Sequence, residues 1–376
     1  MIQIKNQIIC KFSLGDQEDF ITPENLKEFR IFEMAGNRRP IIHLSFNLEN
    51  KKIIKYLNSG NILRLSFGIN EIKQDVIEFE LYGDDTNVNY QTGYTVTLKG
   101  ALYVNSFTSL VGCEIYTGSS LEVFKQIANK HSFGFKTNIE RTNDKMTWER
   151  NGQTEWEFLS HLWLHSFINE DTFISFAFDE HNFYLYDVRQ QIKSGAKWIL
   201  TNKYLSTESS NIIHFGSYTC KNIYGTLSDV VGKNLINKTY NMKTGKIQDD
   251  SYKLKTLSTI DTDKININTT NCKQYDYFIM TGNEHNNYVK AYNQNLRNNI
   301  MYSSFITYLS TAGQFKKIRL LDTVKFDIEP TDNRLSGTGF ITEIVYQYVG
   351  MRLLINLTIN KESPSGIQGK NLKEGE

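Results

Sequence analysis

Apolar and polar residues alternate with a period of two along most of the first third of the chain. The run from Ile77 to Leu81 is the clearest case, because its apolar and charged side chains fall on opposite faces of a strand. Strands are predicted on this basis at residues 2–10, 28–32, 41–48, 62–69, 76–82 and 94–104, with a short helix at 49–57. Short strands in this number, separated by polar turns, favour an antiparallel barrel or sandwich.

The apolar period changes to that of a helix between residues 118 and 188. Helical spacing predicts one helix at 119–131 and a second at 154–163. The residues that carry this spacing are Leu121, Phe124, Ile127 and Ala128 in the first helix, and Trp156, Leu159 and Trp163 in the second. Two strands, 173–178 and 183–188, follow with a connection of hairpin length, so the block predicts a compact α+β module.

Polar residues mark where the two helices begin. Ser119 with Glu122, and Thr154 with Glu157, have the spacing of a capping box. In that motif the hydroxyl accepts a free backbone N–H and the Glu side chain reaches back to the cap residue. Gly134 is predicted to end the first helix in the left-handed backbone conformation that glycine adopts readily.

The remainder of the chain is again predicted to be mainly β. The strands expected here are 212–218, 221–227, 318–328, 337–348 and 352–359. Gly350 marks a tight turn between the last two. A stretch rich in Asn, Lys, Thr and Asp at 237–271 is expected to be an exposed excursion or a mobile loop region, and 289–308 is predicted to be a helix.

Together these elements predict an α+β fold that is mainly β. It has two antiparallel β-barrels, with the α+β module between them and an insertion in the second barrel. The expected domains are a first β-barrel at 1–114, the module at 115–204, a second β-barrel at 205–236 and 313–361, the insertion at 237–312 and a disordered tail at 362–376.

Composition narrows the range of partners. With 42 basic and 41 acidic residues the net charge is +1, so bulk charge predicts no specific binding to nucleic acid. No apolar run reaches membrane-spanning length, and the start of the chain lacks the features of a signal peptide. We therefore expect synthesis in a cytoplasm and no stable membrane insertion. Cys10, Cys113, Cys220 and Cys272 form no close pairs, which predicts buried or half-buried free thiols.

A pair of histidines is the first candidate for chemistry. His161 and His165 lie four residues apart on a predicted helix, with Glu157 one turn earlier, which resembles a metal-binding arrangement. Leu162 stands where a metalloprotease would need its general-base Glu. We interpret the three residues as the polar face of an amphipathic helix, and we assign no catalytic residue, cofactor or metal to the chain.

Tryptophan is the second candidate, because aromatic rings stack on sugars and bases. Trp156 and Trp163 share one helix face and are predicted to lie in the core. Trp148, next to Arg150, is the tryptophan expected to be exposed.

Two further patterns have structural explanations. Gly337 and Gly339 could suggest a phosphate-binding loop, but a strand follows them, so a strand start or bulge is predicted. Glu78 and Glu80 share one strand face and are expected to face solvent, and nothing in the sequence places them across a cleft as a glycosidase requires.

The block at 118–188 resembles the hub proteins of phage tails. In the baseplate hub and late-control families, and in the hub part of type VI secretion spikes, a helix ending in Ile-Ala and a Gly-containing turn precede a Thr/Ser-x-x-x-Phe-Leu helix and a β-hairpin. The same order is present here as Ile127-Ala128, then Gly134, then Thr154 followed by Phe158-Leu159, then the hairpin. The strand that follows Leu335 is similar to the closing strands of such hubs.

This resemblance implies a structural role without catalysis. Three chains would form a homotrimeric ring whose six barrels meet the sixfold tail tube protein on one side and a threefold central spike protein on the other. The ring would be part of the ejection conduit, which also makes the tape-measure protein a candidate partner. The expected location is the tail or baseplate of a virion, assembled in the bacterial host cytoplasm.

Two other functions remain open from the sequence. The first is a tail-associated cell-wall glycan hydrolase, since some hubs carry fused lytic domains. The second is a β-rich receptor-binding or carbohydrate-binding module at the tail tip, which rests on the aromatic content of 13%.

Overall fold

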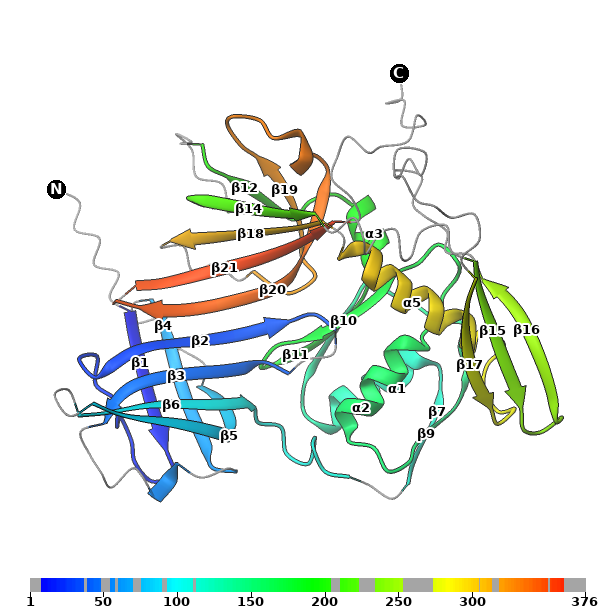
Figure 1. Cartoon of the computed structure of the whole chain (residues 1–376), viewed down its shortest axis with the longest axis horizontal. Coiled ribbons are helices and arrows are strands. Elements are labelled where there is room, and N and C mark those ends of the chain that lie inside the picture. Colours follow the sequence, from blue (N-terminus) through cyan, green and yellow to red (C-terminus); the bar gives the residue numbers. More distant parts are fainter. Residues whose placement is uncertain are drawn as a thin grey trace.

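The chain folds into a mainly β structure of the α+β class (Figure 1). The computed structural model describes residues 8–36, 39–48, 55–57, 60–69, 76–89, 93–110, 113–203, 210–222, 234–252, 273–303, 305–312, 318–350 and 352–361. The predicted helix at 49–57 lies largely outside these residues, and so do Cys272 and the expected tail at 362–376. Among the described residues, no helix is long and apolar enough to cross a membrane.

The first part of the chain forms a curled antiparallel sheet. Its strands are β1 (Ile8–Leu14), β2 (Leu26–Met34), β3 (Ile41–Leu48), β4 (Ile62–Ile69), β5 (Val76–Asn89) and β6 (Gly93–Leu102). They pair in the order β1-β4-β5-β6-β3-β2. Although β1 and β2 are at opposite ends of this order, Phe12 and Phe29 meet edge to face with ring centroids 5.9 Å apart. The sheet therefore closes around a shared apolar core.

Strand β1 differs from its predicted position. It continues to Leu14, four residues past the predicted end at residue 10, and residues 2–7 lie outside the described part. The alternation continues because Phe12 and Leu14 are both buried. The remaining strands predicted in this region are present.

The middle of the chain, which we call the module, combines helices with short strands. It contains β7 (Glu114–Gly118), α1 (Ser120–Lys130), β8 (Gly134–Thr137), β9 (Met146–Arg150), α2 (Glu155–Leu164), β10 (Ile174–Phe178), β11 (Asn182–Asp187) and α3 (Val188–Lys193). Both predicted helices and the β10–β11 hairpin are confirmed. Both capping boxes form, with the backbone N–H of Ser119 2.7 Å from Glu122 and that of Thr154 2.7 Å from Glu157.

The role predicted for Gly134 is wrong. Ser132 is the residue with a left-handed backbone after α1, at φ 58°, and Gly134 begins β8 instead. A Cβ at Gly134 would lie 2.5 Å from Oδ1 of Asn182, so a larger residue there would require the Asn182 side chain to move. Gly134 begins a strand because β8 pairs in parallel with β11, and this pairing places Gly134 opposite Asn182.

The last part of the chain continues the first sheet. Its elements are β12 (Trp198–Thr201), β13 (Ile212–His214), β14 (Ser217–Asn222), β18 (Phe305–Ala312), β19 (Thr323–Asp327), the short 3-10 helix η2 (Asn333–Leu335), β20 (Thr338–Val349) and β21 (Arg352–Lys361). Strand β2 pairs with β20, which makes one 13-stranded sheet of the two regions. Gly337 directly precedes β20 and Gly350 lies in the turn before β21, as the sequence predicts, and both have positive φ.

Two branches of strand pairing lead away from β20. One branch runs from β20 through β19 and β12 to β13, and the other runs through β21 and β18 to β14. Strands β13 and β14 are consecutive in the chain, so residues 212–222 join the two branches. The predicted break between strands, after residue 218, is wrong for this reason. The chain changes partner at Phe215, which donates to Thr201, and Gly216, which donates to Ser310.

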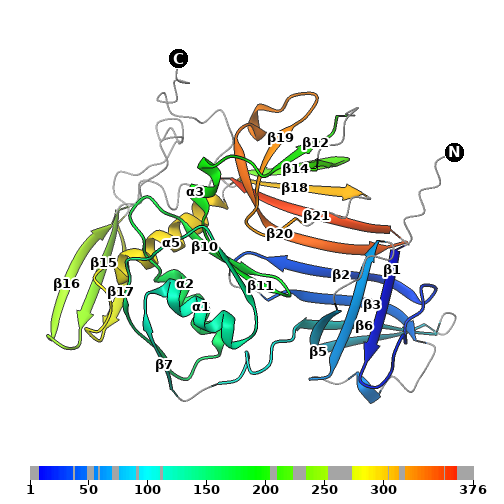
Figure 2. The ribbon, with the colours of Figure 1, turned by 180° about the vertical axis from the view of Figure 1, so that it is seen from behind.

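A separate unit projects from the molecule between β14 and β18. It consists of β15 (Asn234–Asn241), β16 (Lys246–Tyr252), β17 (Lys273–Met280) and α5 (Tyr288–Tyr302), and we call residues 234–252 and 273–302 the arm. The three strands form their own sheet in the order β16-β15-β17. Figures 1 and 2 place this sheet at the opposite end of the molecule from β1, with α5 lying between it and the large sheet.

The polar stretch at 237–271, expected to be an exposed excursion or a mobile loop region, lies in this projecting arm, and its described residues include most of β15 and all of β16. One prediction for this region is wrong. The helix predicted at 289–308 ends at Tyr302, and 305–312 is a strand. In that strand Phe305, Thr307 and Leu309 are buried in alternation, which is a strand period that the helical pattern before it conceals.

The free thiols also depart from expectation at one position. Cys10 and Cys220 are half-buried as predicted, whereas Cys113 is exposed, because it lies just before β7 at the surface of the module.

Candidate functional site

The arm and helix α2 meet at a cluster of histidines. α2 carries His161, and His165 caps its C-terminal end, so both rings lie on one side of the helix. The segment before α5 supplies His285, and the first residue of α5 is Tyr288. We call these four residues the histidine seam. Trp148 of β9 packs behind it, with ring centroids 6.1 Å from His285 and 6.5 Å from His161.

Each ring of the histidine seam has a defined partner. Nδ1 of His165 donates to the carbonyl of Tyr288 at 3.1 Å, and the two rings stack with centroids 3.6 Å apart. Nε2 of His285 donates to the carbonyl of His165 at 3.0 Å. The hydroxyl of Tyr288 lies 3.0 Å from Nε2 of His161. These bonds cross between residues more than 100 positions apart and hold the start of α5 against the end of α2.

Burial keeps the imidazoles neutral. Desolvation lowers the pKa of His161 and of His285, and it lowers the pKa of His165 well below the ordinary value, with His161 adding to the effect. Burial likewise raises the pKa of Tyr288. All four residues of the seam are therefore uncharged at neutral pH.

Glu157, His161 and His165 do not share one polar helix face as interpreted from the sequence, because His165 is buried while Glu157 is exposed, and they do not form a metal-like arrangement. Glu157 is exposed, and its carboxylate accepts the backbone N–H and hydroxyl of Thr154 in the capping box, so it does not join His161 and His165. In the part of the chain that the structure describes, no three His, Cys, Asp or Glu side chains are grouped to hold a metal ion. Sequence spacing alone had suggested a common face for the three residues.

Amide side chains of α5 complete the contact with α2. Nδ2 of Asn295 lies 3.2, 3.2 and 2.8 Å from the carbonyls of Trp163, Leu164 and Ser166. Carbonyls at the end of a helix have no partner within the helix, and Asn295 supplies one. Nε2 of Gln294 donates to the carbonyls of Asn169 and Thr172 at 2.8 and 2.7 Å.

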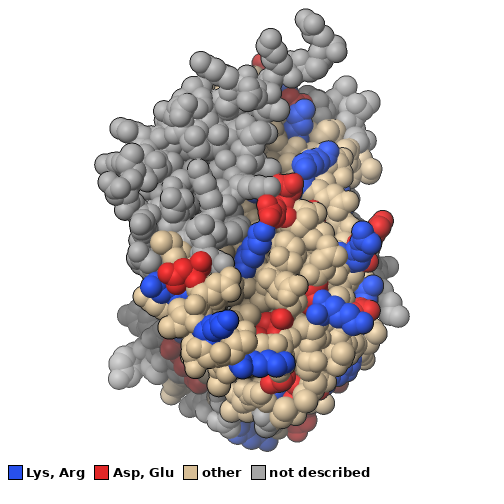
Figure 3. All heavy atoms as spheres, turned by 90° about the vertical axis from the view of Figure 1, so that its right-hand side faces the viewer, with Lys and Arg blue, Asp and Glu red and all other residues tan. Residues whose placement is uncertain are grey.

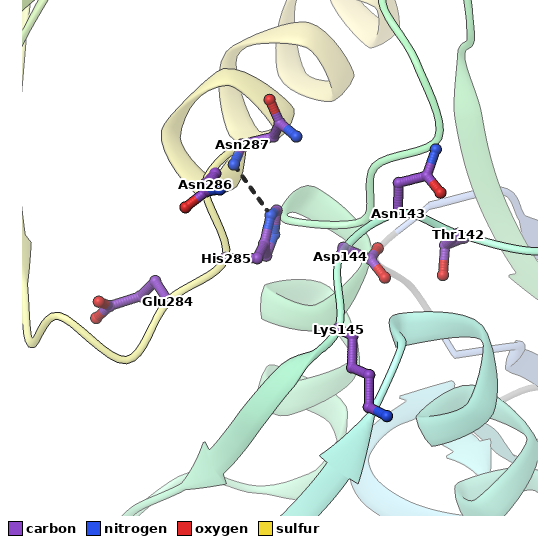
Figure 4. Close-up of a pocket in the computed structure, with 8 residues that line it drawn as sticks. All are labelled: Thr142, Asn143, Asp144, Lys145, Glu284, His285, Asn286 and Asn287. Carbon is purple, nitrogen blue, oxygen red and sulfur yellow. Dashed lines mark hydrogen bonds between the residues drawn. The ribbon is translucent and has the colours of Figure 1, made fainter.

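An open polar pocket lies beside the seam (Figure 4). It is lined by Thr142, Asn143, Asp144, Lys145, Glu284, His285, Asn286 and Asn287. Its two carboxylates bond to nearby backbone: Asp144 accepts the N–H groups of Ser120 and Phe167, and Glu284 accepts those of Thr281 and Gly282. In Figure 4 the side chain of Glu284 points away from Asp144. The pocket thus does not resemble a pair of carboxylates poised for hydrolysis.

Trp148 is not the exposed ring that the sequence predicted. It is fully buried, and its indole N–H donates to the carbonyl of Gly118 at 3.0 Å. Trp163 is buried as expected, and its indole donates to the carbonyl of Ile174 at 2.7 Å. The sugar-stacking interpretation of Trp148 therefore loses its basis.

Sequence reasoning missed a buried ionic cluster in the module. Glu155, the first residue of α2, is fully buried and accepts from His131, Arg150 and Lys130 at 2.8, 3.2 and 3.2 Å. Burial opposes ionisation of Glu155, but His131 and Lys130 outweigh it and hold its pKa below the ordinary value. The only sequence signal was an acidic residue in the first turn of a helix, which is common on helix surfaces as well.

The outer face of the arm sheet is the most exposed apolar surface among the described residues. Tyr240 lies opposite Ile247 on β16 and Ile279 on β17, so the three side chains form one row. Ile247 is 72% exposed and Ile279 is 73% exposed, and Tyr277 in the next row is 74% exposed. Figure 3 shows the side of the molecule on which the arm lies, where basic and acidic residues are interspersed among uncharged ones. An exposed apolar row of this kind is typical of an interaction surface.

Comparison with known proteins depends on structure, because no family model and no curated protein matches the sequence. A tail protein from Neisseria meningitidis MC58 is similar with a TM-score of 0.57 and 9% identity, over 94% of this chain and 97% of its own. The 43 kDa tail protein of prophage MuSo2 from Shewanella oneidensis is similar with a TM-score of 0.57 and 11% identity, over 96% of this chain and 99% of its own.

The chain has the fold of phage tail proteins. A third solved structure extends the likeness to secretion machines: the E. coli c3393 protein, a component of the type VI secretion system, which is itself described as similar to the T4 tail proteins gp27 and gp5. It matches with a TM-score of 0.51 and 11% identity, over 96% of this chain and 78% of its own. The phage-tail fold thus spans the large sheet, the module and the arm together. The resemblance predicted from residues 118–188 is confirmed at the level of the fold.

Proposed function

We propose that the chain is a structural hub of a phage tail or related injection machine. Three copies form a ring that adapts the sixfold tail tube to a threefold central spike and forms part of the ejection conduit. The observation that carries this proposal is the phage-tail fold, shared over 94% and 96% of the chain with two tail proteins of nearly the same length. In this proposal each copy contributes two barrel-like regions, 1–114 and 205–236 with 313–361, which gives the ring six.

The partners follow from this position. They are two further copies of the chain, the tail tube protein and the central spike protein, with the tape-measure protein passing through the conduit. The ring is assembled in the bacterial host cytoplasm and ends in the virion tail. The mixed charge on the face in Figure 3 suits a surface that contacts other proteins and does not grip nucleic acid.

A role without catalysis is supported by the polar pocket. Its carboxylates are bonded to local backbone, and its histidine is neutral and hydrogen-bonded on both ring nitrogens. These hydrogen bonds give the titratable groups of the pocket structural roles.

Imaging of the chain together with its tail tube protein tests the proposal. Negative-stain class averages are expected to show threefold rings alone, and rings seated on the end of the tube when both proteins are present. Isolated single copies in both samples would contradict the proposal.

A further inference from the structure

The contact between the arm and the module is polar where a permanent contact is usually apolar. The inward face of α5 buries amide side chains, and they bond to module or arm groups: Asn293, Gln294, Asn295 and Asn298. Hydrogen bonds exchange with water at small net cost, so such a contact separates more readily than a hydrophobic one. The histidine seam lies at the N-terminal end of α5 in this contact.

The two ends of α5 are held differently. At its C-terminal end Tyr302 is buried and stacks on Phe173 with ring centroids 4.9 Å apart, and Met301 is buried in the same apolar cluster. At its N-terminal end Tyr288 meets His161 and His165. A weakening of the seam would therefore leave the N-terminal half of α5 held mainly by the hydrogen bonds of Gln294 and Asn295, while the C-terminal end keeps its apolar contacts.

The hydrogen bonds of His285 require a neutral ring. Its Nδ1 accepts the backbone N–H of Asn287 at 3.2 Å, while its Nε2 donates to the carbonyl of His165. A protonated imidazole donates from both nitrogens and cannot accept, so protonation breaks the first bond.

Repulsion would add to this loss. The rings of His161 and His165 have centroids 4.6 Å apart, so two imidazolium groups there would repel at short range. Protonation of the seam therefore weakens the contact between α5 and α2 in two ways: it removes a hydrogen bond, and it brings like charges close together.

Some charged groups around the seam favour protonation of its histidines, and others oppose it. Asp144 and Glu284 favour protonation of His285, whereas Lys145 lines the same pocket with a positive charge. Glu157 on α2 is bonded to Thr154. On the outer side of α5, Lys290 pairs with Glu170 from the loop after α2. That ion pair is partly exposed to solvent and contributes little.

We propose that the arm is a latch that opens in acid: protonation of His161, His165 and His285 releases the N-terminal half of α5, and the arm sheet attached to it, from α2. The arm sheet moves with α5 because Phe278 packs edge to face on Tyr292, and Asn293 donates to Asn237. This inference holds whether or not the chain forms a ring.

The direction of the pH dependence follows from the environment of the rings. Burial lowers the pKa of all three histidines in the closed arrangement, and release returns them to the ordinary value of about 6.5. The open form therefore binds more protons below that value. The contact has full strength above about pH 6.5 and weakens progressively as the pH falls below it.

Hydrogen–deuterium exchange of the full chain at pH 7.5 and pH 5.5, corrected for the intrinsic effect of pH on exchange, tests the latch. Amides in the N-terminal half of α5 are expected to exchange about tenfold faster or more at pH 5.5. Amides of β20 and of the C-terminal end of α5 are expected to keep their rates. Equal corrected rates in α5 at both pH values, or an equal gain across the whole chain, would overturn the proposal.

Neutral substitutes identify the residues responsible. His161→Gln, His165→Asn and His285→Gln keep a polar atom near the nitrogens used in the seam, and the triple variant is expected to lose the pH response. His214→Gln on β13 is the control and is expected to keep it. If the triple variant does not fold, the single variant His285→Gln replaces it in the test. Its α5 amides are expected to show a smaller increase in exchange rate at pH 5.5 than those of the unchanged chain. An undiminished response in the folded variant would contradict the assignment to these histidines.

Discussion

Glu155 shows how one buried charge organises the module. It lies at the start of α2, and its carboxylate joins His131 and Lys130 from the end of α1 with Arg150 from β9. The guanidinium of Arg150 also reaches Glu114 on β7 at 2.9 Å. Four elements thus converge on one cluster, which fixes how the two helices and the two-stranded sheet pack.

Removal of the Glu155 charge is expected to destabilise the chain. Glu155→Gln leaves the fully buried Arg150 with one carboxylate in place of two, and breaking a buried pair costs about 3 kcal/mol. The free energy of unfolding from urea titration measures the effect. Glu149→Gln is the control, because Glu149 lies at an exposed position of β9, the strand that carries Arg150. This change should alter stability by less than about 0.5 kcal/mol. Equal values for the two variants would show that the cluster carries no stability.

At the scale of elements, α5 is unusual in burying amides. In the sequence, the buried face of α5 is polar. The prediction therefore followed apolar residues on other sides of the helix and continued past Tyr302 into residues that form β18. The amides are buried because they cap carbonyls at the end of α2 and in the loop after it, which no pattern within α5 reveals.

Loss of one such amide is expected to weaken the contact between arm and module. Asn295→Ala leaves three carbonyls of the α2 terminus without this donor, at a cost of about 2 kcal/mol. Thermal and urea unfolding measure it. Asn299→Ala, on the exposed side of the same helix, is the matched control and should be nearly neutral. A neutral Asn295→Ala would mean that water replaces the amide without loss.

The elements that the sequence predicted best are those fixed by local chemistry. Both capping boxes and both helices of the module follow from a hydroxyl and a carboxylate three residues apart, and the structure has them at those positions. Burial of Trp148 and Glu155 depends on contacts with distant segments, so the prediction for Trp148 had the opposite exposure and the sequence did not indicate that Glu155 is buried. The same holds for the histidine seam, because His285 and Tyr288 reach α2 from more than 100 residues away.

At the scale of the whole molecule, the outer face of the arm sheet is an exposed apolar surface that contact with another chain would cover. Its apolar row is left exposed by a sheet whose other face packs on α5 through Phe278 and Asn237. We expect the doubly substituted variant Tyr277→Ser with Ile279→Ser to fold but to dissociate more readily into single chains. Sedimentation velocity across a range of concentrations measures this. Tyr308→Ser, at an exposed position of β18, is the control. Unchanged association of the double variant would place the contact elsewhere.

The oligomeric mass in solution tests the hub most directly. Light scattering coupled to size-exclusion chromatography on the purified chain is expected to give three times the chain mass of 43.6 kDa. A single-chain mass at every concentration, unchanged when tail tube protein is added, would contradict the account.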